Sequence, residues 1–151
     1  MLKNTRTHVV CLPLPPVINR INPLKILLVD DETYMRVFVG QALRVSINCT
    51  LSEARNGEEA IATCEASDPD LIILDIHMPR MDGVTALGKI RALKPDTPVC
   101  MLTSASEEAV VESCVNAGAS FFIRKDVRAG LLRNELAAML EQFFPEENAP
   151  Q

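Results

Sequence analysis

Short apolar runs and longer amphipathic stretches follow each other in a regular succession along the chain. Short aliphatic runs bounded by polar residues are typical of buried strands, and apolar residues at three- and four-residue spacing are typical of helices. The short runs predict five strands, at 25–29, 49–54, 70–74, 98–103 and 120–124. The longer stretches predict five helices, at 33–46, 58–67, 83–94, 107–118 and 128–144.

The alternation of strands and helices predicts one open α/β domain with a mostly parallel sheet, over residues 24–144. A chain of 151 residues has room for one domain of ordinary size, not for two. Four prolines within residues 1–23 predict an extended, flexible N-terminal extension. Residues 145–151 form a short polar tail, so we expect no output domain after the last helix.

Composition and charge restrict the possible functions. The net charge of −5 argues against nucleic-acid binding, although residues 1–23 carry +3 and the remainder −8. No apolar run reaches the ~18 residues of a membrane span, and prolines interrupt the apolar start, which argues against a signal peptide. The five cysteines show no zinc-site spacing, which predicts reduced thiols in a cytoplasmic protein.

Polar residues with complementary chemistry follow four of the predicted strands. Asp30, Asp31 and Glu32 follow the first strand and Asp75 the third. Thr103 ends the fourth strand and Lys125 follows the fifth. In a parallel sheet these positions share one edge, where ligands bind. Converging carboxylates repel each other unless they hold a hard cation such as Mg²⁺.

This set of side chains suits the transfer of a phosphoryl group. Lys125 would neutralise its charge, Thr103 would donate a hydrogen bond, and Asp75 would attack phosphorus as the nucleophile. Each residue also has a simpler interpretation: Asp30 and Asp31 could only cap the first helix, Thr103 could be a loop hydroxyl, and Lys125 a solvated charge. The occurrence of all four groups at strand ends favours the functional interpretation.

Four segments resemble, in order and spacing, the landmarks of response-regulator receiver domains, the phosphoacceptor half of two-component signalling. They are ILLVDDE, LIILDIHMPRMDG, LTSAS and GASFFIRK, and the resemblance covers about residues 25–144. It implies a doubly wound, flavodoxin-like five-stranded parallel sheet in the order 2-1-3-4-5, with five helices. It also implies a CheY-like, stand-alone cytoplasmic phosphoprotein that is not a conventional enzyme, apart from slow hydrolysis of its own aspartyl phosphate.

The resemblance implies a role for individual residues of the acidic group. Asp75 matches the phosphorylated aspartate and is also a ligand of Mg²⁺. Asp31 matches the direct ligand of the metal, and Asp30 the residue that acts through water. His77 would offer its main-chain carbonyl to the metal; its side chain is expected to face solvent.

The resemblance also covers the residues that respond to the phosphoryl group. Thr103 matches the hydroxyl that moves toward it, and Lys125 matches the lysine that contacts it. Phe122 occupies the position of the switch aromatic, although its periodicity alone predicts core packing. The family usually places proline after the lysine, whereas this chain has Asp126. We therefore predict a trans Lys125–Asp126 peptide, a Lys125 amine that still lies at the acidic site, and an N-cap role for Asp126.

The expected partners are a histidine kinase or phosphotransfer protein as phosphodonor and a downstream protein target, with no nucleic acid and no membrane. The face of the fourth helix, fifth strand and fifth helix is a candidate homodimer interface. Two alternatives remain. One is a receiver-like scaffold that works without phosphorylation. The other is a phosphatase of the haloacid-dehalogenase kind, which would need a second acid where this chain has His77.

Overall fold

The computed structural model describes residues 21–104 and 108–146. Most of the predicted N-terminal extension (1–20), the first position of the predicted fourth helix (107) and the end of the C-terminal tail (147–151) lie outside these ranges. The strands are β1 (Leu24–Val29), β2 (Cys49–Ala54), β3 (Leu71–Asp75), β4 (Val99–Thr103) and β5 (Phe121–Arg124). The helices are α1 (Thr33–Ser46), α2 (Gly57–Ala66), α3 (Gly83–Leu93), α4 (Glu108–Asn116) and α5 (Ala129–Phe143).

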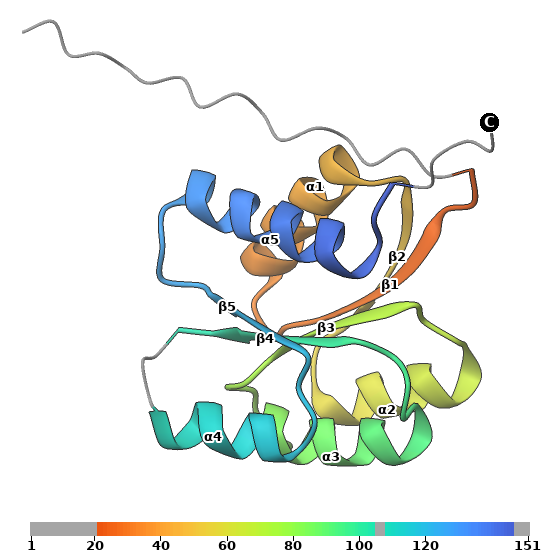
Figure 1. The fold of residues 1–151 in the computed structure, drawn as a ribbon. Helices are drawn as coiled ribbons and strands as arrows, with labels where there is room; N and C mark the ends of the chain where they lie inside the picture. The colour runs from red at the N-terminus through yellow and green to blue at the C-terminus, as the bar shows by residue number, and fades with distance from the viewer. Residues whose placement is uncertain (1–20, 105–107, 147–151) are drawn as a thin grey trace, which may run out of the picture.

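The five strands form one parallel sheet in the order β2-β1-β3-β4-β5, which confirms the predicted topology. Helices α1 and α5 cover one face of the sheet, and α2, α3 and α4 cover the other (Figure 1). The strand order reverses between β1 and β3, so the carboxyl ends of these two neighbours lie where a doubly wound sheet binds ligands.

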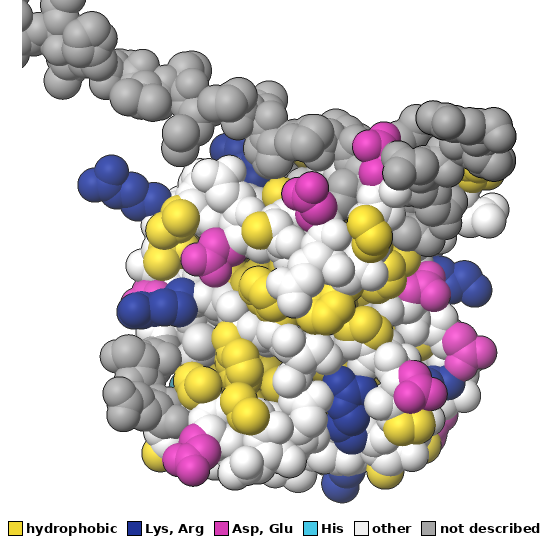
Figure 2. Space-filling view, viewed as in Figure 1, with side chains coloured by type: hydrophobic (Ala, Val, Ile, Leu, Met, Phe, Trp, Pro, Cys, Tyr) yellow, Lys and Arg dark blue, Asp and Glu magenta, His cyan; other side chains and the backbone are white. Residues whose placement is uncertain are grey.

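Helix α4, strand β5 and helix α5 lie on the same side of the domain, the side that faces the viewer in Figure 1. Figure 2 shows hydrophobic side chains gathered across the middle of this face and over α4, with acidic and basic side chains around them. Val115 on α4 is 54% exposed, and Phe121 and Phe122 on β5 are half-buried. This face therefore presents apolar surface to solvent.

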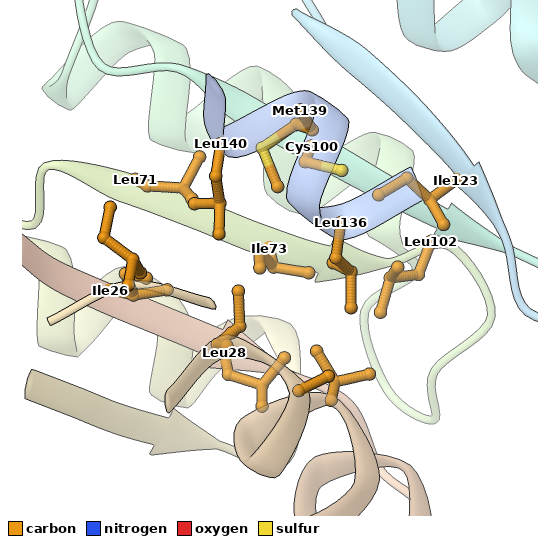
Figure 3. Close-up of a cluster of buried hydrophobic side chains, with 14 of the residues drawn as sticks. Ile26, Leu28, Leu71, Ile73, Cys100, Leu102, Ile123, Leu136, Met139 and Leu140 are labelled. Atoms are coloured by element: carbon orange, nitrogen blue, oxygen red, sulfur yellow. The ribbon is translucent and has the colours of Figure 1, made fainter. Parts of the chain in front are cut away.

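Burial on both sides explains why the central strands are so easily recognised. Every residue of β3 and β4 is buried. Successive side chains point to opposite faces. Ile26, Ile73 and Leu102 pack against α1 and α5, as Figure 3 shows for the α5 side, whereas Leu27 and Leu74 pack against α2, α3 and α4. Strands between two helical layers must be aliphatic throughout, so a carboxylate at the end of such a strand stands out.

The helix starts follow local sequence signals in two places and depart from them in a third. Asn56 caps α2 by accepting a hydrogen bond from the Glu59 amide (2.9 Å), and Asp82 caps α3 by accepting one from Thr85 (2.8 Å). The predicted N-cap role of Asp126 is wrong. Helix α5 begins at Ala129, and its N-cap residue Arg128 makes no side-chain capping bond.

Four of the five cysteines lie in the described ranges. Cys49, Cys64, Cys100 and Cys114 are all free, and the last three are fully buried. Within residues 21–104 and 108–146, no helix combines the length and apolar character that crossing a membrane requires.

Candidate functional site

The first part of the site is the acidic turn between β1 and α1. Asp30 is fully buried, whereas Asp31 and Glu32 are exposed. One carboxylate oxygen from each of the three residues lies within 4.8 Å of the others. The turn is fixed locally, because Asp30 Oδ1 accepts a hydrogen bond from the Glu32 amide at 2.9 Å.

The second part is Asp75, which is the last residue of β3 rather than the first residue after it. It is only 2% exposed and lies in register with Leu102 of β4. Its Oδ1 lies 3.4 Å from the amide of His77, which donates to it. A strand that is buried on both faces therefore holds this carboxylate at the sheet edge.

Lys125 joins the two acidic parts. Its Nζ lies 2.8 Å from Asp30 Oδ2, 3.3 Å from Asp75 Oδ2 and 3.6 Å from Glu32 Oε1. The Lys125 side chain is only 7% exposed, and its amide donates to the carbonyl of Thr103 at 2.7 Å. No cis peptide occurs in the described chain, so the Lys125–Asp126 bond is trans. The prediction of a trans bond with the amine at the acidic site is therefore confirmed.

Asp126, which stands where the family usually has proline, forms an ion pair. Its carboxylate accepts from Arg124 Nε at 2.9 Å and from Nη2 at 2.5 Å. Arg124 and Asp126 flank Lys125 in the sequence, and both are exposed, whereas Lys125 points into the site. The ion pair therefore connects the two sequence neighbours of Lys125, the residue that contacts Asp30 and Asp75.

The electrostatics of the site place the positive charge on Lys125 and make Asp75 a weaker acid than usual. Burial, reinforced by the charge of Asp30, raises the pKa of Asp75 from 3.8 to about 6, although Lys125 opposes this shift. Burial alone would lower the pKa of Lys125, but the carboxylates of Asp30 and Asp75 outweigh it and the pKa is raised. At neutral pH Asp75 is thus largely ionised, close to its point of titration.

The remaining predicted residues surround this group. Thr103 ends β4, next to the strand of Asp75, and is 5% exposed. His77 is exposed, as its side chain was expected to be. Phe122 is half-buried and packs against the core on the α2–α4 side of the sheet, so at least part of its role is packing.

Comparison with known proteins identifies this arrangement. Residues 26–137 match the response regulator receiver domain. The chain belongs to this family. A chemotaxis protein CheY from Listeria monocytogenes is 37% identical over 106 residues, which cover 70% of this chain and 89% of that protein.

Two further similarities extend the comparison of this receiver domain. A protein-glutamate methylesterase/protein-glutamine glutaminase from Rhodospirillum rubrum is 45% identical over 103 residues, 67% of this chain but only 28% of that protein. A chain in the crystal structure of the CheX-CheY-BeF3-Mg²⁺ complex from Borrelia burgdorferi superposes with a TM-score of 0.69 at 28% identity, covering 78% of this chain and 90% of that chain.

The donor set of the receiver domain fits a magnesium ion. Carboxylate oxygens are the ligands that this hard cation prefers. Asp30 Oδ2 is buried and accepts no well-formed hydrogen bond in the described part of the chain, and its 2.8 Å contact with Lys125 is ionic. A buried anionic oxygen of this kind can gain a second cation without losing a hydrogen bond.

Two polar residues beside the site were not singled out as site residues from the sequence. Glu32 shares Lys125 with the two aspartates. Arg36, 9% exposed, donates to the carbonyl of Asp30 (2.7 Å) and to Thr33 Oγ1 (3.2 Å), and so supports the acidic turn from behind. The sequence offers one signal for Arg36, which is a charged residue next to Met35 on the buried side of α1.

Gly83 fixes the loop that follows Asp75. A Cβ on Gly83 would lie 2.3 Å from the carbonyl oxygen of Asp75 and 2.6 Å from the Cα of Ile76, so the backbone approaches as closely as only glycine allows. We expect Gly83→Ala to lower the free energy of unfolding by about 1–3 kcal/mol, because backbone must move to relieve the contact. Urea unfolding at pH 7 measures the change.

Gly88 provides the control, because it lies on the same helix and nothing lies within 4 Å of its added Cβ. Gly88→Ala is expected to stabilise the protein by about 0.5–1 kcal/mol through helix propensity. Equal effects of the two substitutions would contradict a specific contact at Gly83.

Proposed function

We propose that this receiver domain accepts a phosphoryl group on Asp75 from a histidine kinase or phosphotransfer protein, in a reaction that depends on Mg²⁺. The observation that carries the proposal is the position of Lys125, whose buried ammonium group lies within 3.3 Å of both Asp30 and Asp75. At such a site the buried ammonium group can bind an oxygen of an anion, while the carboxylates bind a counter-cation. Membership of the receiver family supports the same function.

In the proposed reaction, the ionised carboxylate of Asp75 is the nucleophile. One of its oxygens forms the new bond to phosphorus while the bond from phosphorus to the donor nitrogen breaks. The electron pair of that bond stays on the imidazole of the donor, which then takes up a proton. Because the pKa of Asp75 is about 6, the carboxylate is available for attack at neutral pH.

The other residues bind and orient the phosphoryl group in this proposal. Mg²⁺, when bound, supplies positive charge to the phosphoryl oxygens. Asp30, Asp31, Asp75 and the main-chain carbonyl of His77 would hold it, and exposed Glu32 adds negative charge nearby. Lys125 exchanges its contact with Asp75 for one with a phosphoryl oxygen.

We propose that the signal leaves through the face of α4, β5 and α5. Thr103 and Phe122 lie on the adjacent strands β4 and β5, where movement of the hydroxyl toward the phosphoryl group can alter the packing of the aromatic ring. The hydrophobic side chains on this face (Figure 2) suit a protein partner or a second copy. We place the protein in the cytoplasm, acting through protein contacts rather than as a conventional enzyme.

A small phosphodonor tests the proposal directly. Acetyl phosphate with Mg²⁺ should add the mass of one phosphoryl group to the intact protein. Asp75→Asn should abolish the addition, and Asp68→Asn, at an exposed carboxylate near the opposite end of β3, should retain it. Mass spectrometry measures both.

The result also separates the three functions considered. If acetyl phosphate adds no phosphoryl group to the wild-type protein, and the protein does not respond to beryllofluoride either, the phosphoacceptor function is contradicted and a scaffold is favoured. Turnover of an external phosphoester that requires Asp75 would instead favour a phosphatase.

A further inference from the structure

Helix α1 carries apolar side chains on its outer side as well as on its core side. Tyr34 is 72% exposed, Val37 52% and Val45 54%, and together they account for three of the seven large hydrophobic residues exposed in the described ranges. The rings of Tyr34 and half-buried Phe38 are stacked, with centroids 6.4 Å apart. These residues form an aromatic and aliphatic stripe along the outer side of the helix, which we call the α1 stripe.

A groove lies beside the α1 stripe. It has a volume of about 250 Å³ and lies between α1 and α5. Its lining consists of Phe38, Gln41, Ala42 and Val45 from α1 and Arg133 from α5. The groove is therefore mainly apolar, has an aromatic wall and is continuous with the exposed stripe.

The start of the described chain lies next to this helix. The amide of Leu24, the first residue of β1, donates to the carbonyl of Asn48, two residues after the end of α1, at 2.9 Å. Ile21, which leads into β1, is 91% exposed. Strand β1 therefore starts beside the C-terminal end of α1, three residues after the described chain begins.

The sequence of this extension matches the groove chemically. Residues 9–18 read VVCLPLPPVI, an apolar segment with a Pro-Leu-Pro-Pro run at 13–16. Proline fixes the backbone near the polyproline II conformation, so binding costs little conformational entropy, and aromatic-lined grooves are the usual receptors of such segments. Four residues, 17–20, separate this run from Ile21, where the described chain begins, so the run lies within roughly 17 Å of Ile21 at about 3.3 Å per residue. Residues 9–18 would extend over roughly 31 Å in the polyproline II conformation, whereas the 14 residues of α1 span about 21 Å, so the segment is long enough to lie along the stripe.

We propose that residues 9–18 of the same chain dock on the α1 stripe and in the groove between α1 and α5. Covalent attachment through a short linker gives the segment an effective concentration of about the millimolar range, so weak apolar contacts are enough for occupancy. The extension then covers the outer surface of α1 rather than moving freely. This proposal does not depend on phosphorylation of Asp75.

Cys11 lies within the proposed segment and provides a position for a spin label. In a full-length Cys49→Ser protein, the other three cysteines are fully buried, so a nitroxide reagent modifies Cys11. The label should reduce the amide signals of α1 by more than half in ¹H–¹⁵N NMR spectra, and leave those of α3 unchanged. Helix α3 is the internal control because it lies on the opposite face of the sheet (Figure 1). Uniformly weak effects on both helices would overturn the proposal and indicate a free extension.

Two further samples identify the occupant and the contact. In one sample, spin-labelled protein at natural isotope abundance is mixed with ¹⁵N protein that carries no spin label, and the α1 amide signals should be unaffected. Broadening of these signals as strong as in protein that carries both labels would show that a second copy binds, and would overturn the proposal. The double substitution Tyr34→Ser and Val37→Ser, at exposed sites that preserve the fold, should abolish most of the broadening. Leu93→Ser, at a 41% exposed position of α3, is the matched control and should retain it. Persistence in the double variant would overturn docking on the stripe.

Discussion

Lys125→Met is expected to destabilise the metal-free protein at pH 7 by about 3–5 kcal/mol, because it removes one partner of a buried ion-paired group. Lys125 is 7% exposed and is the cation shared by Asp30, Asp75 and Glu32. Methionine matches the length of the aliphatic part of lysine but leaves two buried carboxylates facing each other. Urea unfolding of wild type and variant measures the difference.

Two effects should reduce the loss of stability in this variant, namely protonation of Asp75 and binding of Mg²⁺. Lys125 holds down the pKa of Asp75, so its removal raises that pKa further and Asp75 takes up a proton near neutrality. Proton uptake brings the loss to the lower end of the range. Millimolar Mg²⁺ should raise the free energy of unfolding of the variant by at least as much as that of the wild type, because Mg²⁺ and the Lys125 ammonium neutralise the same carboxylates.

Lys89→Met is the control for Lys125→Met, because Lys89 is exposed on α3. Its effect should lie within about 0.5 kcal/mol of zero, as for ordinary surface substitutions. A comparable loss in both variants, or a Lys125→Met protein as stable as the wild type, would contradict the interpretation of Lys125 as the buried counter-ion.

Much of this fold is predictable because its central strands have no polar face. β3 and β4 are buried on both sides, so they form unbroken aliphatic runs that end abruptly at Asp75 and Thr103. Parallel pairing then places those ends at one edge of the sheet without further information. The starts of α2 and α3 depend on equally local signals, because Asn56 and Asp82 cap these helices through bonds that reach only three residues along the chain.

Contacts between distant parts of the chain were less predictable. Asp126 carries the signature of an N-cap, yet the chain continues to Ala129 before α5 begins, and Arg124 binds the carboxylate instead. Arg36 is one helical turn from the acidic residues in the sequence, but its contact with the Asp30 carbonyl depends on how α1 lies on the sheet. Local propensity does not contain this packing information, and it is the packing that decides which charges are buried together.

Asp75→Asn is expected to make the metal-free protein more stable at pH 7, although it removes the proposed phosphoacceptor. Burial and the charge of Asp30 raise the pKa of Asp75 to about 6 from an ordinary value of 3.8, so the folded state disfavours the ionised carboxylate. A difference of roughly two pKa units corresponds to about 3 kcal/mol. Asparagine is isosteric with the protonated acid and avoids this cost.

The pH dependence fixes the sign of the effect. Below about pH 4 the carboxyl group is protonated in both the folded and unfolded states, and wild type and Asp75→Asn should be equally stable. Between pH 4 and 6 the unfolded state loses its proton before the folded state does, so the wild type loses stability as pH rises. Above pH 6 Asp75 is ionised in both states, and the difference in unfolding free energy between wild type and Asp75→Asn stays constant. Urea unfolding from pH 3 to 8 in chelator measures this curve, including the region in which the two proteins should be equally stable.

Asp68→Asn should behave in the opposite way and serves as the control. The Lys94 ammonium, which accompanies Asp68 in an exposed ion pair, lowers the pKa of that carboxyl group, so its substitution should cost slight stability at neutral pH. Mg²⁺ should narrow the gap between wild type and Asp75→Asn, because the cation offsets the charge that destabilises the wild type. A difference in stability that persists unchanged at pH 3 would show that packing, rather than the cost of holding an ionised carboxylate ready for attack, distinguishes the two proteins.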